Sequence, residues 1–563
     1  MSQTLQQTYH MHDAIPSSRQ NSTVLIVGGG PVGLALAIEL GLRNVPCLLV
    51  EQMARDGFHK HPRANLINSR SMEFCRRWGV AELVKQVGTP PDYPHTAMYV
   101  TGMRAHMVAR IERPDHGGDG PPLFTPEPAQ RCNQIWFDPV LRERAASLRS
   151  VQLRFRCALK RFEQDTSGVT AWLHDLDSGE TFTHRSDWLA ACCGGRSPVR
   201  SLLGIDRGEG QVLGAPLSIY FRTQELWRYH DKGKGVLHFI IDQNGVWATL
   251  NSLNGGDLWR VTLHGGAKVY GEPEQVDHRA ILARIVGCDF PYELIAISPW
   301  VRRKLVTARF RYDRVFLAGD CAHQNTPSGG YGMNTGLADA VDLGWKLAAV
   351  SQGWAGDVLL QSYDAERRPV ALQNVEEATR NFNLRSFPEP RPALLQDTPE
   401  GAAQRHALGE EILRHTAREL TSDGIAMGYV YAGSPVICSD GTPAPAFSVT
   451  DYQQTSYPGA RAPHVWISPG QSTVDLFGDS LVLLCLGPRP VQSATAAIQR
   501  LTQSAAALGA PLSVHVLDLP AALAAYEGYP LVLVRPDGHV AWRGHELPSD
   551  GAALLQRVLG LSG

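Results

Sequence analysis

Hydrophobic residues along the chain fall into short blocks that alternate between strand-like and helix-like patterns. Residues 24–27 form an apolar run, a Gly-rich turn follows at 28–33, and residues 34–42 have the composition of a buried helix. Residues 47–50 form a second apolar run. Apolar strands that alternate with helices are typical of a parallel sheet covered on both faces. The pattern predicts a Rossmann-like α/β domain that follows a polar tail over residues 1–21.

A second strand, loop and helix pattern occupies residues 314–347, almost 300 residues after the first Gly-rich turn. An apolar run, Val315–Ala318, leads into Gly319 and Asp320. The loop that follows carries Pro327, Gly329, Gly330 and Gly332, and an amphipathic helix comes next. A carboxylate followed by bare amides at a helix N-terminus suits a ligand that has hydroxyls and a delocalised negative charge. A flavin offers both groups.

Residues 210–300 show the period of two that is typical of half-buried strands. Strand-like segments at 214–223, 235–242, 245–252 and 258–265 are separated by Gly, Asn and Asp turns, which predicts a mixed or antiparallel sheet. Alternation places Ser218, Tyr220 and Arg222 on one face, and it places Trp247 and Thr249 together on a face of a nearby strand. The pocket candidates of this sheet are Tyr220, Arg222, His238 and Trp247. For each one, ordinary packing or surface exposure is the competing and commoner role.

Apolar runs and helical stretches alternate again from about residue 430, which predicts a second α/β domain. The pattern therefore divides the chain into three domains and a connection. We expect an α/β domain that carries both Gly-rich segments at 22–92, 127–209 and 301–400, a sheet domain at 93–126 and 210–300, a helical connection at 401–429 and a C-terminal domain at 430–563.

Composition narrows the function classes. The 563 residues are 43% hydrophobic and 19% charged, and a net charge of −2 favours neither nucleic acid nor an anionic membrane as a partner. Residues 24–42 are about long enough to span a bilayer, but three consecutive glycines and a proline argue against a continuous helix. The N-terminus lacks the apolar core of a signal peptide, and the ten cysteines include no CxxC pair. We expect a cytoplasmic protein with reduced thiols.

The first Gly-rich turn has the spacing of a dinucleotide fingerprint. Gly28 permits the tight turn, Gly30 lets the backbone approach a pyrophosphate, and Gly33 lets the helix pack on the strand. Glu51 lies 23 residues after Gly28, close to the spacing of an acid that binds a ribose diol. A carboxylate there disfavours a 2′-phosphate, so the tightly held nucleotide is expected to be FAD or NAD. The absence of a second GxGxxG argues against a reductase with two Rossmann domains.

Three blocks of the chain resemble the class A flavoprotein monooxygenases, the para-hydroxybenzoate hydroxylase-like family. They are Gly28–Glu51, residues 187–205 (DWLAACCGGRSPVRSLLGI), which are similar to the motif GADGxxSxVR, and residues 314–347, which match GDAAHxxPPxGGxGxNxGxxDAxNLxWKL. Residues 61–79, 132–141 and 363–371 match flanking patterns, so the resemblance frames residues 22–371. The C-terminal domain is similar to the thioredoxin-like domain of phenol, hydroxyphenylpropionate and aromatic polyketide hydroxylases. Since it has no CxxC, we interpret it as a structural or dimer-contact unit.

The resemblance implies an FAD-dependent monooxygenase that uses NADPH or NADH and O2. It would hydroxylate a small aromatic, phenolic substrate through a flavin C4a-hydroperoxide, as a monomer or a homodimer. The fold implied is a Rossmann-like FAD-binding domain with an inserted mixed-sheet substrate domain and a C-terminal thioredoxin-like domain. Two alternatives stay open. One is a Baeyer–Villiger or other oxidative tailoring monooxygenase, and the other is a flavin-binding protein without independent turnover.

The resemblance also implies roles for individual residues. Arg63 and Gln134 would face the pyrophosphate or ribityl chain, Asp320 would bind a ribityl hydroxyl, and Pro327 and Gly330 would lie at the reactive edge of the flavin. The complete set of implied FAD contacts is Gly28, Gly30, Pro31, Val32, Gly33, Glu51, Gln52, Arg63, Gln134, Asp320, Pro327, Gly330, Gly332, Met333 and Asn334. Asn325 joins the candidate substrate pocket. No cluster of residues has metal-ligand spacing, so no metal is expected.

Two departures from the family pattern concern the flavin. Cys193 stands where the central motif has Asp, which affects the expected engagement of the nicotinamide. Gln324-Asn325-Thr326 replaces the usual approach to Pro327, on the side where the substrate is expected. Tolerated drift is the alternative interpretation of both, since a site is defined by geometry and not by a motif.

Overall fold

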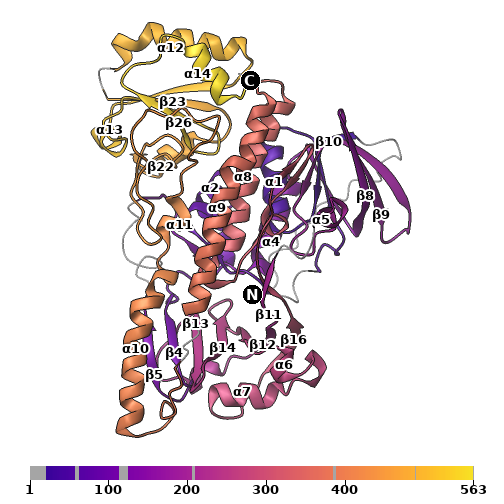
Figure 1. Ribbon diagram of the computed structural model, residues 1–563, viewed down its shortest axis with the longest axis vertical. Helices are drawn as coiled ribbons and strands as arrows, with labels where there is room; N and C mark the ends of the chain where they lie inside the picture. Colours follow the sequence, from indigo (N-terminus) through magenta and orange to yellow (C-terminus); the bar gives the residue numbers. More distant parts are fainter. Residues whose placement is uncertain are drawn as a thin grey trace.

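The computed structural model describes residues 21–57, 62–112, 124–205, 210–384, 389–487 and 490–561. The tail predicted over residues 1–21 lies outside the described residues apart from Asn21, which begins the first strand. Figure 1 shows three parts: a central α/β domain, a sheet below it and a smaller α/β domain above it. None of the helices in the described part of the chain has both the length and the apolar character needed to cross a lipid bilayer.

The central domain is built on a twisted sheet with the strand order β18-β19-β10-β1-β2-β7. Its strands are β1 (Asn21–Val27), β2 (Cys47–Glu51), β7 (Val151–Phe155), β10 (Thr181–Ala191), β18 (Arg311–Tyr312) and β19 (Val315–Leu317), with β8 (Cys157–Asp165) and β9 (Gly168–Asp175) extending it. Val27 pairs with Val50 and with Ala191, and Ala191 pairs with Leu317, all in parallel ladders. The carboxyl ends of β1, β2, β10 and β19 therefore meet at one edge, where ligands of such sheets bind.

Helices cover this sheet and pack with its strands to form the central core. They are α1 (Pro31–Leu42), α2 (Ser69–Arg77), α3 (Ala81–Val87), α4 (Gln134–Ala146), α5 (Pro198–Leu202), α8 (Tyr331–Ser351) and α9 (Asp357–Leu384). A short ladder pairs β3 (Leu66–Ile67) with β6 (Gln130–Arg131) beside α4. The long helix α9 runs along the front of the molecule and reaches from the upper domain toward the lower sheet (Figure 1).

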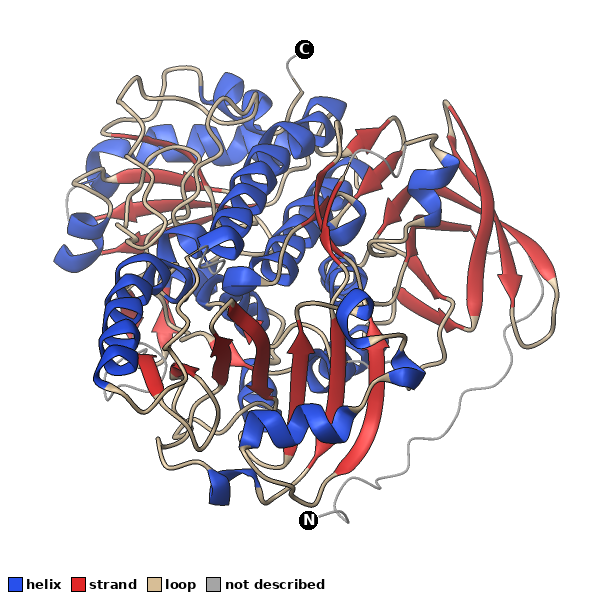
Figure 2. Ribbon diagram, turned by 60° about the horizontal axis from the view of Figure 1, so that its bottom comes forward, coloured by secondary structure: helices blue, strands red, loops and turns tan. Residues whose placement is uncertain are grey.

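The lower part is a sheet with the order β16-β12-β15-β14-β13-β4-β5. Its strands are β4 (Ala97–Val100), β5 (Met107–Ile111), β12 (Leu217–Arg222), β13 (Leu237–Asp242), β14 (Gly245–Ser252), β15 (Leu258–Leu263) and β16 (Glu293–Pro299). The pairs are antiparallel except for β13 with β4, which is parallel, so the sheet is mixed. Figure 2 shows the strands side by side at the bottom of the molecule.

The two faces of this sheet have different partners. The outer face packs Ile219, Phe221 and Val261 against helix α7 (His278–Val286). The inner face turns toward the central domain, and at one end α10 (Pro399–Leu420) covers it through Leu408 and Ile412. The short elements around this sheet are β11 (Gln211–Gly214), η3 (Leu226–Tyr229), α6 (Ala267–Tyr270), η4 (Pro273–Gln275), β17 (Arg302–Val306) and β20 (His323–Gln324). The predicted helical connection thus includes a helix that completes the sheet's inner layer.

The C-terminal domain has a sheet with the order β24-β23-β25-β26. Its elements are β21 (Trp466–Ser468), β22 (Gln471–Ser472), η7 (Thr473–Leu476), β23 (Leu481–Leu486), β24 (Leu512–Leu517), β25 (Leu531–Val534), β26 (Val540–Gly544), α12 (Pro490–Ala507), α13 (Pro520–Ala525) and α14 (Gly551–Val558), preceded by α11 (Asp423–Met427). Strands β23 and β24 are parallel and the other pairs are antiparallel, as in a thioredoxin-like fold. The apolar stretch at 458–467 is mostly irregular, because Pro458 and Pro463 remove backbone donors.

A buried ionic network joins the C-terminal domain to the central one. Arg535, which follows β25, donates to Glu366 of α9 at 2.7 and 2.8 Å and to Asp342 of α8 at 3.0 Å. Lys346 donates to the same two carboxylates at 2.8 and 2.7 Å. All four side chains are at most 1% exposed. Burial alone would raise the pKa of Glu366, but Arg535 and Lys346 outweigh it and hold the pKa below its ordinary value.

The first prediction concerns this network. Replacing Arg535 by Met leaves Glu366 and Asp342 buried with one cation fewer, so we expect unfolding to require roughly 3–5 kcal/mol less free energy. Denaturant and thermal unfolding of the purified protein measure the change. Arg55→Met is the control, because Arg55 pairs with Glu143 at the surface and such pairs contribute about 1 kcal/mol or less. Equal losses for the two variants would contradict the role given to Arg535.

Candidate functional site

The glycines of the first turn create a cradle between β1 and α1. Gly28 has a φ of +114°, and a Cβ on it would lie 2.4 Å from the carbonyl oxygen of Cys192. A Cβ on Gly33 would lie 2.0 Å from the carbonyl oxygen of Gly28. A Cβ on Gly30 would meet nothing within 4 Å, so open space lies above the residue that precedes α1. The bare first turn of α1 faces this space, as a pyrophosphate requires.

Glu51 is fixed at the end of β2 beside this cradle. Its Oε2 accepts a hydrogen bond from the Gly29 amide at 2.7 Å, and its Oε1 accepts one from the Met53 amide at 2.8 Å. The side chain of Gln52, by contrast, is exposed. Each carboxylate oxygen of Glu51 keeps a lone pair, so the geometry suits a ribose diol at this position.

The second Gly-rich segment packs directly against the first. A Cβ on Gly319 would lie 2.9 Å from Cγ2 of Val32, and a Cβ on Gly336 would lie 2.6 Å from the same atom. Asp320 follows Gly319 in the short turn η5 (Gly319–Cys321), and its side chain is accessible to solvent. Partial desolvation by the surrounding chain raises the pKa of Asp320, while His323, Arg63 and Arg200 oppose that effect. The structure thus brings the two signatures, 292 residues apart at Gly28 and Asp320, to one cleft.

Arg63 lies near this cleft, since its charge acts on the pKa of Asp320, and Gln134 lies beside the Arg63 segment. The Gln134 side-chain oxygen accepts from the Ala64 amide at 3.1 Å, which ties the start of α4 to the Arg63 segment. The Arg63 carbonyl accepts from Arg260 of the lower sheet at 2.9 Å, while the Arg63 side chain is exposed. The cleft therefore lies between the glycine cradle and the inner face of the lower sheet.

The loop before α8 is held open by backbone conformation and by side chains. Gly329 and Gly330 have φ values of +82° and +72°, in the region that favours glycine. The Asn334 amide donates to the carbonyls of Gly330 and Leu66, and its oxygen accepts from the Asn68 amide at 3.0 Å. These bonds fix the loop at the start of α8, where the first helical amides favour a negative charge. Pro327 is exposed on this loop, Gly332 is half-buried, and Met333 is buried just inside the helix.

Two supporting residues, Glu419 and Asp339, are missing from the sequence-based predictions. Glu419, near the end of α10, accepts a hydrogen bond from the Gly329 amide at 2.9 Å, although it lies 90 residues further along the chain. Asp339 of α8 accepts from the Gly319 amide at 3.0 Å and pairs with His323 and Arg367, each at 2.8 Å. No local pattern marks Glu419. For Asp339 the available signal was the Asp-Ala pair in the family motif matched by residues 314–347.

The structure separates the four candidates of the lower sheet. Tyr220 lies on the inner face, where it packs with Trp136 of α4. Arg222 follows it on the same face, but its side chain is 52% exposed and pairs loosely with Asp257 and Glu293. His238 lies on the outer face, with its Nε2 3.2 Å from Nε2 of His230.

Trp247 also lies on the outer face, under the guanidinium of Arg284 from α7. The expected alternation with Thr249 fails because β14 has one extra residue opposite Ile240 and Ile241. Such a bulge shifts all the side chains on one side of it to the other face. His238 and Trp247 are therefore not brought together with Tyr220 at the cleft.

The two departures from the family pattern lie together at the floor of the cleft. The Sγ of Cys193 lies 3.1 Å from the hydroxyl of Ser197 and 3.5 Å from the Sγ of Cys321. Gln324 donates to the carbonyls of Gly195 and Asp320 at 3.2 and 3.3 Å. Among the described residues, Nδ2 of Asn325 is buried and has no hydrogen-bond partner. Thr326 donates to the Ala378 carbonyl at 2.7 Å and so anchors the loop to α9.

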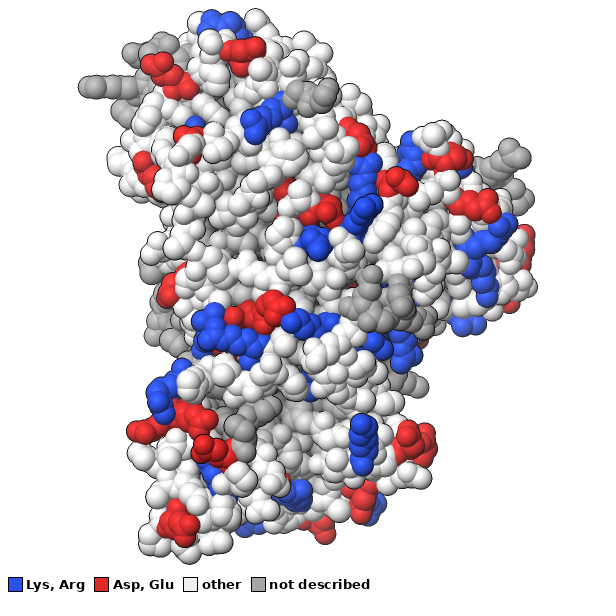
Figure 3. Space-filling model, viewed as in Figure 1, with Lys and Arg blue, Asp and Glu red and all other residues white. Residues whose placement is uncertain are grey.

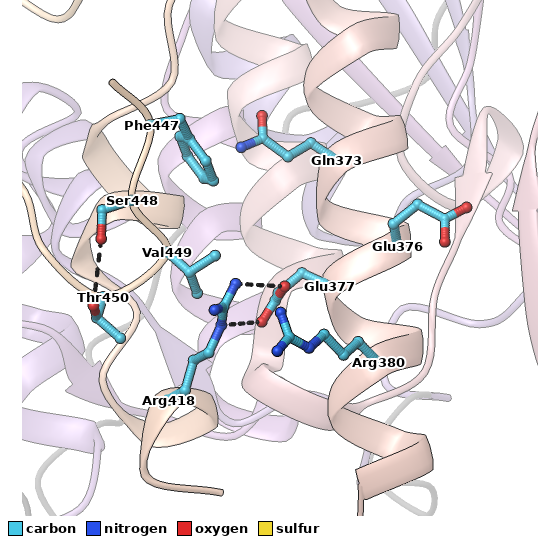
Figure 4. A pocket seen from close by; sticks show the side chains of 9 residues that line it. All are labelled: Gln373, Glu376, Glu377, Arg380, Arg418, Phe447, Ser448, Val449 and Thr450. Atoms are coloured by element: carbon cyan, nitrogen blue, oxygen red, sulfur yellow. Dashed lines mark hydrogen bonds and ion pairs between the residues drawn. The ribbon is translucent and has the colours of Figure 1, made fainter. Parts of the chain in front are cut away.

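A separate open cavity of about 560 Å³ lies between α9, the end of α10 and the segment 447–450. Figure 4 shows Gln373 projecting from α9 toward Phe447 and Arg380 projecting toward Arg418. Arg418 pairs with Glu377 at 2.7 and 3.1 Å. None of its lining residues is a candidate for FAD or substrate. The cavity is therefore distinct from the glycine-lined cleft.

Charge is distributed evenly over the face seen in Figure 3. Basic and acidic side chains intermingle there, and a mixed band crosses the middle of the molecule without forming a large area of one sign. This surface has no feature that favours a polyanion as a partner.

Four features of the cleft fit an FAD molecule bound across the strand ends. They are the glycine cradle that a Cβ would fill, Glu51 at the end of β2, the carboxylate of Asp320 and the start of α8. They define an FAD-binding α/β protein whose cofactor site is built from two segments that are far apart in the sequence. Residues 21–378 match the family model described as FAD binding domain, and residues 455–561 match the one described as aromatic-ring hydroxylase, C-terminal. The chain belongs to the FAD-dependent aromatic-ring hydroxylases, which confirms the expected family and cofactor.

Relatives and solved structures agree with this assignment. A putative polyketide hydroxylase of Streptomyces halstedii is 34% identical over 93% of both chains. The 4-methyl-5-nitrocatechol 5-monooxygenase of a Burkholderia species is 32% identical over 95% of this chain and 96% of that one. The structure of RebC soaked with chromopyrrolic acid, with bound 7-carboxy-K252c, is 38% identical and superposes with a TM-score of 0.88 over 97% of this chain and all of that one.

The second prediction separates binding from folding at the cradle. In Gly30→Ala the new methyl group meets no protein atom but enters the space above the turn, so we expect a normal fold and a loss of FAD affinity of about tenfold or more, or about 1.4 kcal/mol. Flavin absorbance per chain and titration of the FAD-free protein measure the loss. Gly256→Ala, in the turn before β15, is the control, because its nearest contact of 3.6 Å is ordinary and FAD binding is expected to be unchanged. Unaltered affinity in Gly30→Ala would place the pyrophosphate elsewhere.

Proposed function

We propose that the protein is an FAD-dependent monooxygenase that uses NAD(P)H and O2 to hydroxylate an aromatic substrate. The observation that carries this proposal is the single cleft formed by the glycine cradle, Asp320 and the start of α8. The hydroxylases and monooxygenases that match over 93–95% of the chain support it. Bound FAD would accept hydride from the nicotinamide and activate O2, and the protein would hold the ring, exclude water and orient the substrate.

The residues of the cleft divide these tasks. The turn at Gly28–Gly33 and the acid Glu51 would hold the pyrophosphate and the ribose, and Arg63 would balance the phosphate charge. Asp320 would accept a hydrogen bond from a ribityl hydroxyl. The amides at the start of α8 would stabilise negative charge on the reduced ring, because the first amides of a helix have no intrahelical partner.

The substrate would lie between the loop at 324–330 and the inner face of the lower sheet. Arg260 links that face to the Arg63 segment, and Tyr220 lies in the neighbouring strand position. The buried Nδ2 of Asn325 supplies an unused donor for an oxygen on the aromatic ring system.

We propose a polycyclic aromatic substrate in preference to a single ring. Solved neighbours support this choice: RebC is seen with 7-carboxy-K252c, and aklavinone-11 hydroxylase, 28% identical with a TM-score of 0.79, is seen with FAD and aklavinone.

The third prediction tests the activity itself. Holoenzyme is supplied with NADPH or NADH in air-saturated buffer, with single-ring phenols in one series and polycyclic phenols in another. We expect the polycyclic series to stimulate nicotinamide oxidation and to yield a product that has gained one oxygen atom, measured by mass spectrometry. Stimulation by single-ring phenols alone would overturn the substrate class. If compounds that bind produce no stimulated oxidation in either series, the monooxygenase proposal fails.

The fourth prediction concerns Asn325. Its replacement by Ala removes one neutral hydrogen bond to the substrate, so KM is expected to rise roughly 2- to 10-fold while FAD content stays the same. Steady-state oxidation of the nicotinamide gives KM, and flavin absorbance gives the FAD content. Gln373→Ala, in the cavity of Figure 4, is the matched amide control and should leave KM unchanged. An effect confined to Gln373→Ala would move the substrate to that cavity.

A further inference from the structure

Cys193 and Cys321 are brought together by the fold from positions 128 residues apart. Cys193 follows β10 and Cys321 ends the turn η5, so each follows the end of a neighbouring parallel strand. Their sulfur atoms are 3.5 Å apart, and a disulfide bond is about 2.0 Å long. The two sulfur atoms would therefore have to approach each other by about 1.5 Å to form a disulfide bond.

Side chains already hold the two cysteine-bearing loops in place. Arg200 donates to the carbonyl of Cys321 at 3.2 Å and to that of Gly195 at 2.6 Å. Gln324 bridges the same loops through the carbonyls of Gly195 and Asp320. Gly194 next to Cys193 has a φ of +78°, and a Cβ on it would meet no atom within 4 Å. The loop can therefore adjust at this residue. Since the loops are fixed in register, the sulfurs face each other without a change of fold.

The two thiols differ in a way that assigns their chemical roles. Cys193 is half-buried, while Cys321 is fully buried. The hydrogen bond from Cys321 lowers the pKa of Cys193 against the effect of burial, and the Ser197 hydroxyl adds to the lowering. Burial raises the pKa of Cys321. A half-buried thiol with stabilised thiolate reacts first with an oxidant, and a neighbouring buried thiol can resolve the product.

We propose that Cys193 and Cys321 form a reversible disulfide when the protein meets hydrogen peroxide. The Cys193 thiolate attacks one peroxide oxygen, the O–O bond breaks, and the second oxygen leaves as hydroxide, which takes up a proton. The sulfur of Cys321 then displaces water from the resulting Cys193 sulfenic acid and loses its proton. In total, two thiols and one peroxide give one disulfide and two waters, with two electrons passing from sulfur to oxygen.

The disulfide protects the floor of the FAD cleft from irreversible damage. A sulfenic acid that finds no thiol proceeds to sulfinic and sulfonic acids, which thiol reductants do not restore. Cys193 lies against the glycine cradle, since its Cα is 2.7 Å from the place where a Cβ on Gly28 would be. An added sulfonate would therefore place a bulky negative charge beside the expected pyrophosphate. Resolution by Cys321 prevents this.

The fifth prediction tests the pair on the holoenzyme. After a short exposure to hydrogen peroxide, free thiols are alkylated under denaturing conditions and the peptides are mapped without reductant. We expect a cross-linked peptide that joins Cys193 to Cys321, the loss of two alkylatable thiols, and full recovery of both on treatment with dithiothreitol. A Cys192–Cys193 cross-link, or Cys193 sulfinic acid without any cross-link, would overturn the assignment.

Variants make the outcome specific. In Cys321→Ser the same treatment should drive Cys193 to sulfinic and sulfonic acids that dithiothreitol leaves in place. Cys288→Ser, which removes another half-buried thiol, is the matched control and should give the wild-type cross-link. If Cys321→Ser does not fold, Cys193→Ser serves instead, and it should show no peroxide-dependent change at Cys321. Because the readouts are mass and thiol content, a failed cross-link and a failed monooxygenase assay are distinguishable.

Discussion

The close packing of α8 on α1 is the constraint on which the rest of the structure depends. Val32 touches the positions of Gly319 and Gly336, where a side chain would have no room. Gly344 fits in the same way against Glu39, at the far end of α1. With larger residues the two helices would separate, and Asp320 would leave the edge where the glycine cradle lies. One helix contact therefore makes a single cleft from two segments that are distant in the chain.

The same two helices also determine where the C-terminal domain can dock. Asp342 and Lys346 extend the buried face of α8, and Glu366 of α9 completes a set of charges that Arg535 enters from the C-terminal domain. The carboxylates of Asp342, Glu366 and Asp537 lie close enough together to hold a metal ion, but Arg535 already pairs with all three and Lys346 with two of them. Charges buried so deeply need their partners in place. The C-terminal domain thus stabilises the helix that carries the flavin-edge loop.

The sequence predicts those features of the structure that depend on residues close together in the chain. The glycine cradle, Glu51, Asp320 and the α8 loop are local patterns of turn and strand-end chemistry, and the fold class predicted from them is confirmed. Trp247 was placed on the wrong face, because a single-residue bulge at Val246–Ala248 of β14 reverses the face of a side chain and contains no Gly or Pro. Glu419 and Arg260 reach the cleft only through tertiary packing, so no spacing along the chain indicates them.

The division between local and tertiary signals has a functional consequence. Groups that would hold FAD come mainly from turns at strand ends, where a few residue types satisfy strict backbone geometry. Groups that would meet the substrate come from the inner sheet face and from the loop at 324–330, which is held by the hydrogen bond from the Gly329 amide to Glu419 of α10. Each of these segments can vary without disturbing the cradle. Substrate selectivity in this architecture can therefore change while the cofactor site keeps its shape. Asn325 lies in the loop at 324–330, which would meet both the flavin and the substrate.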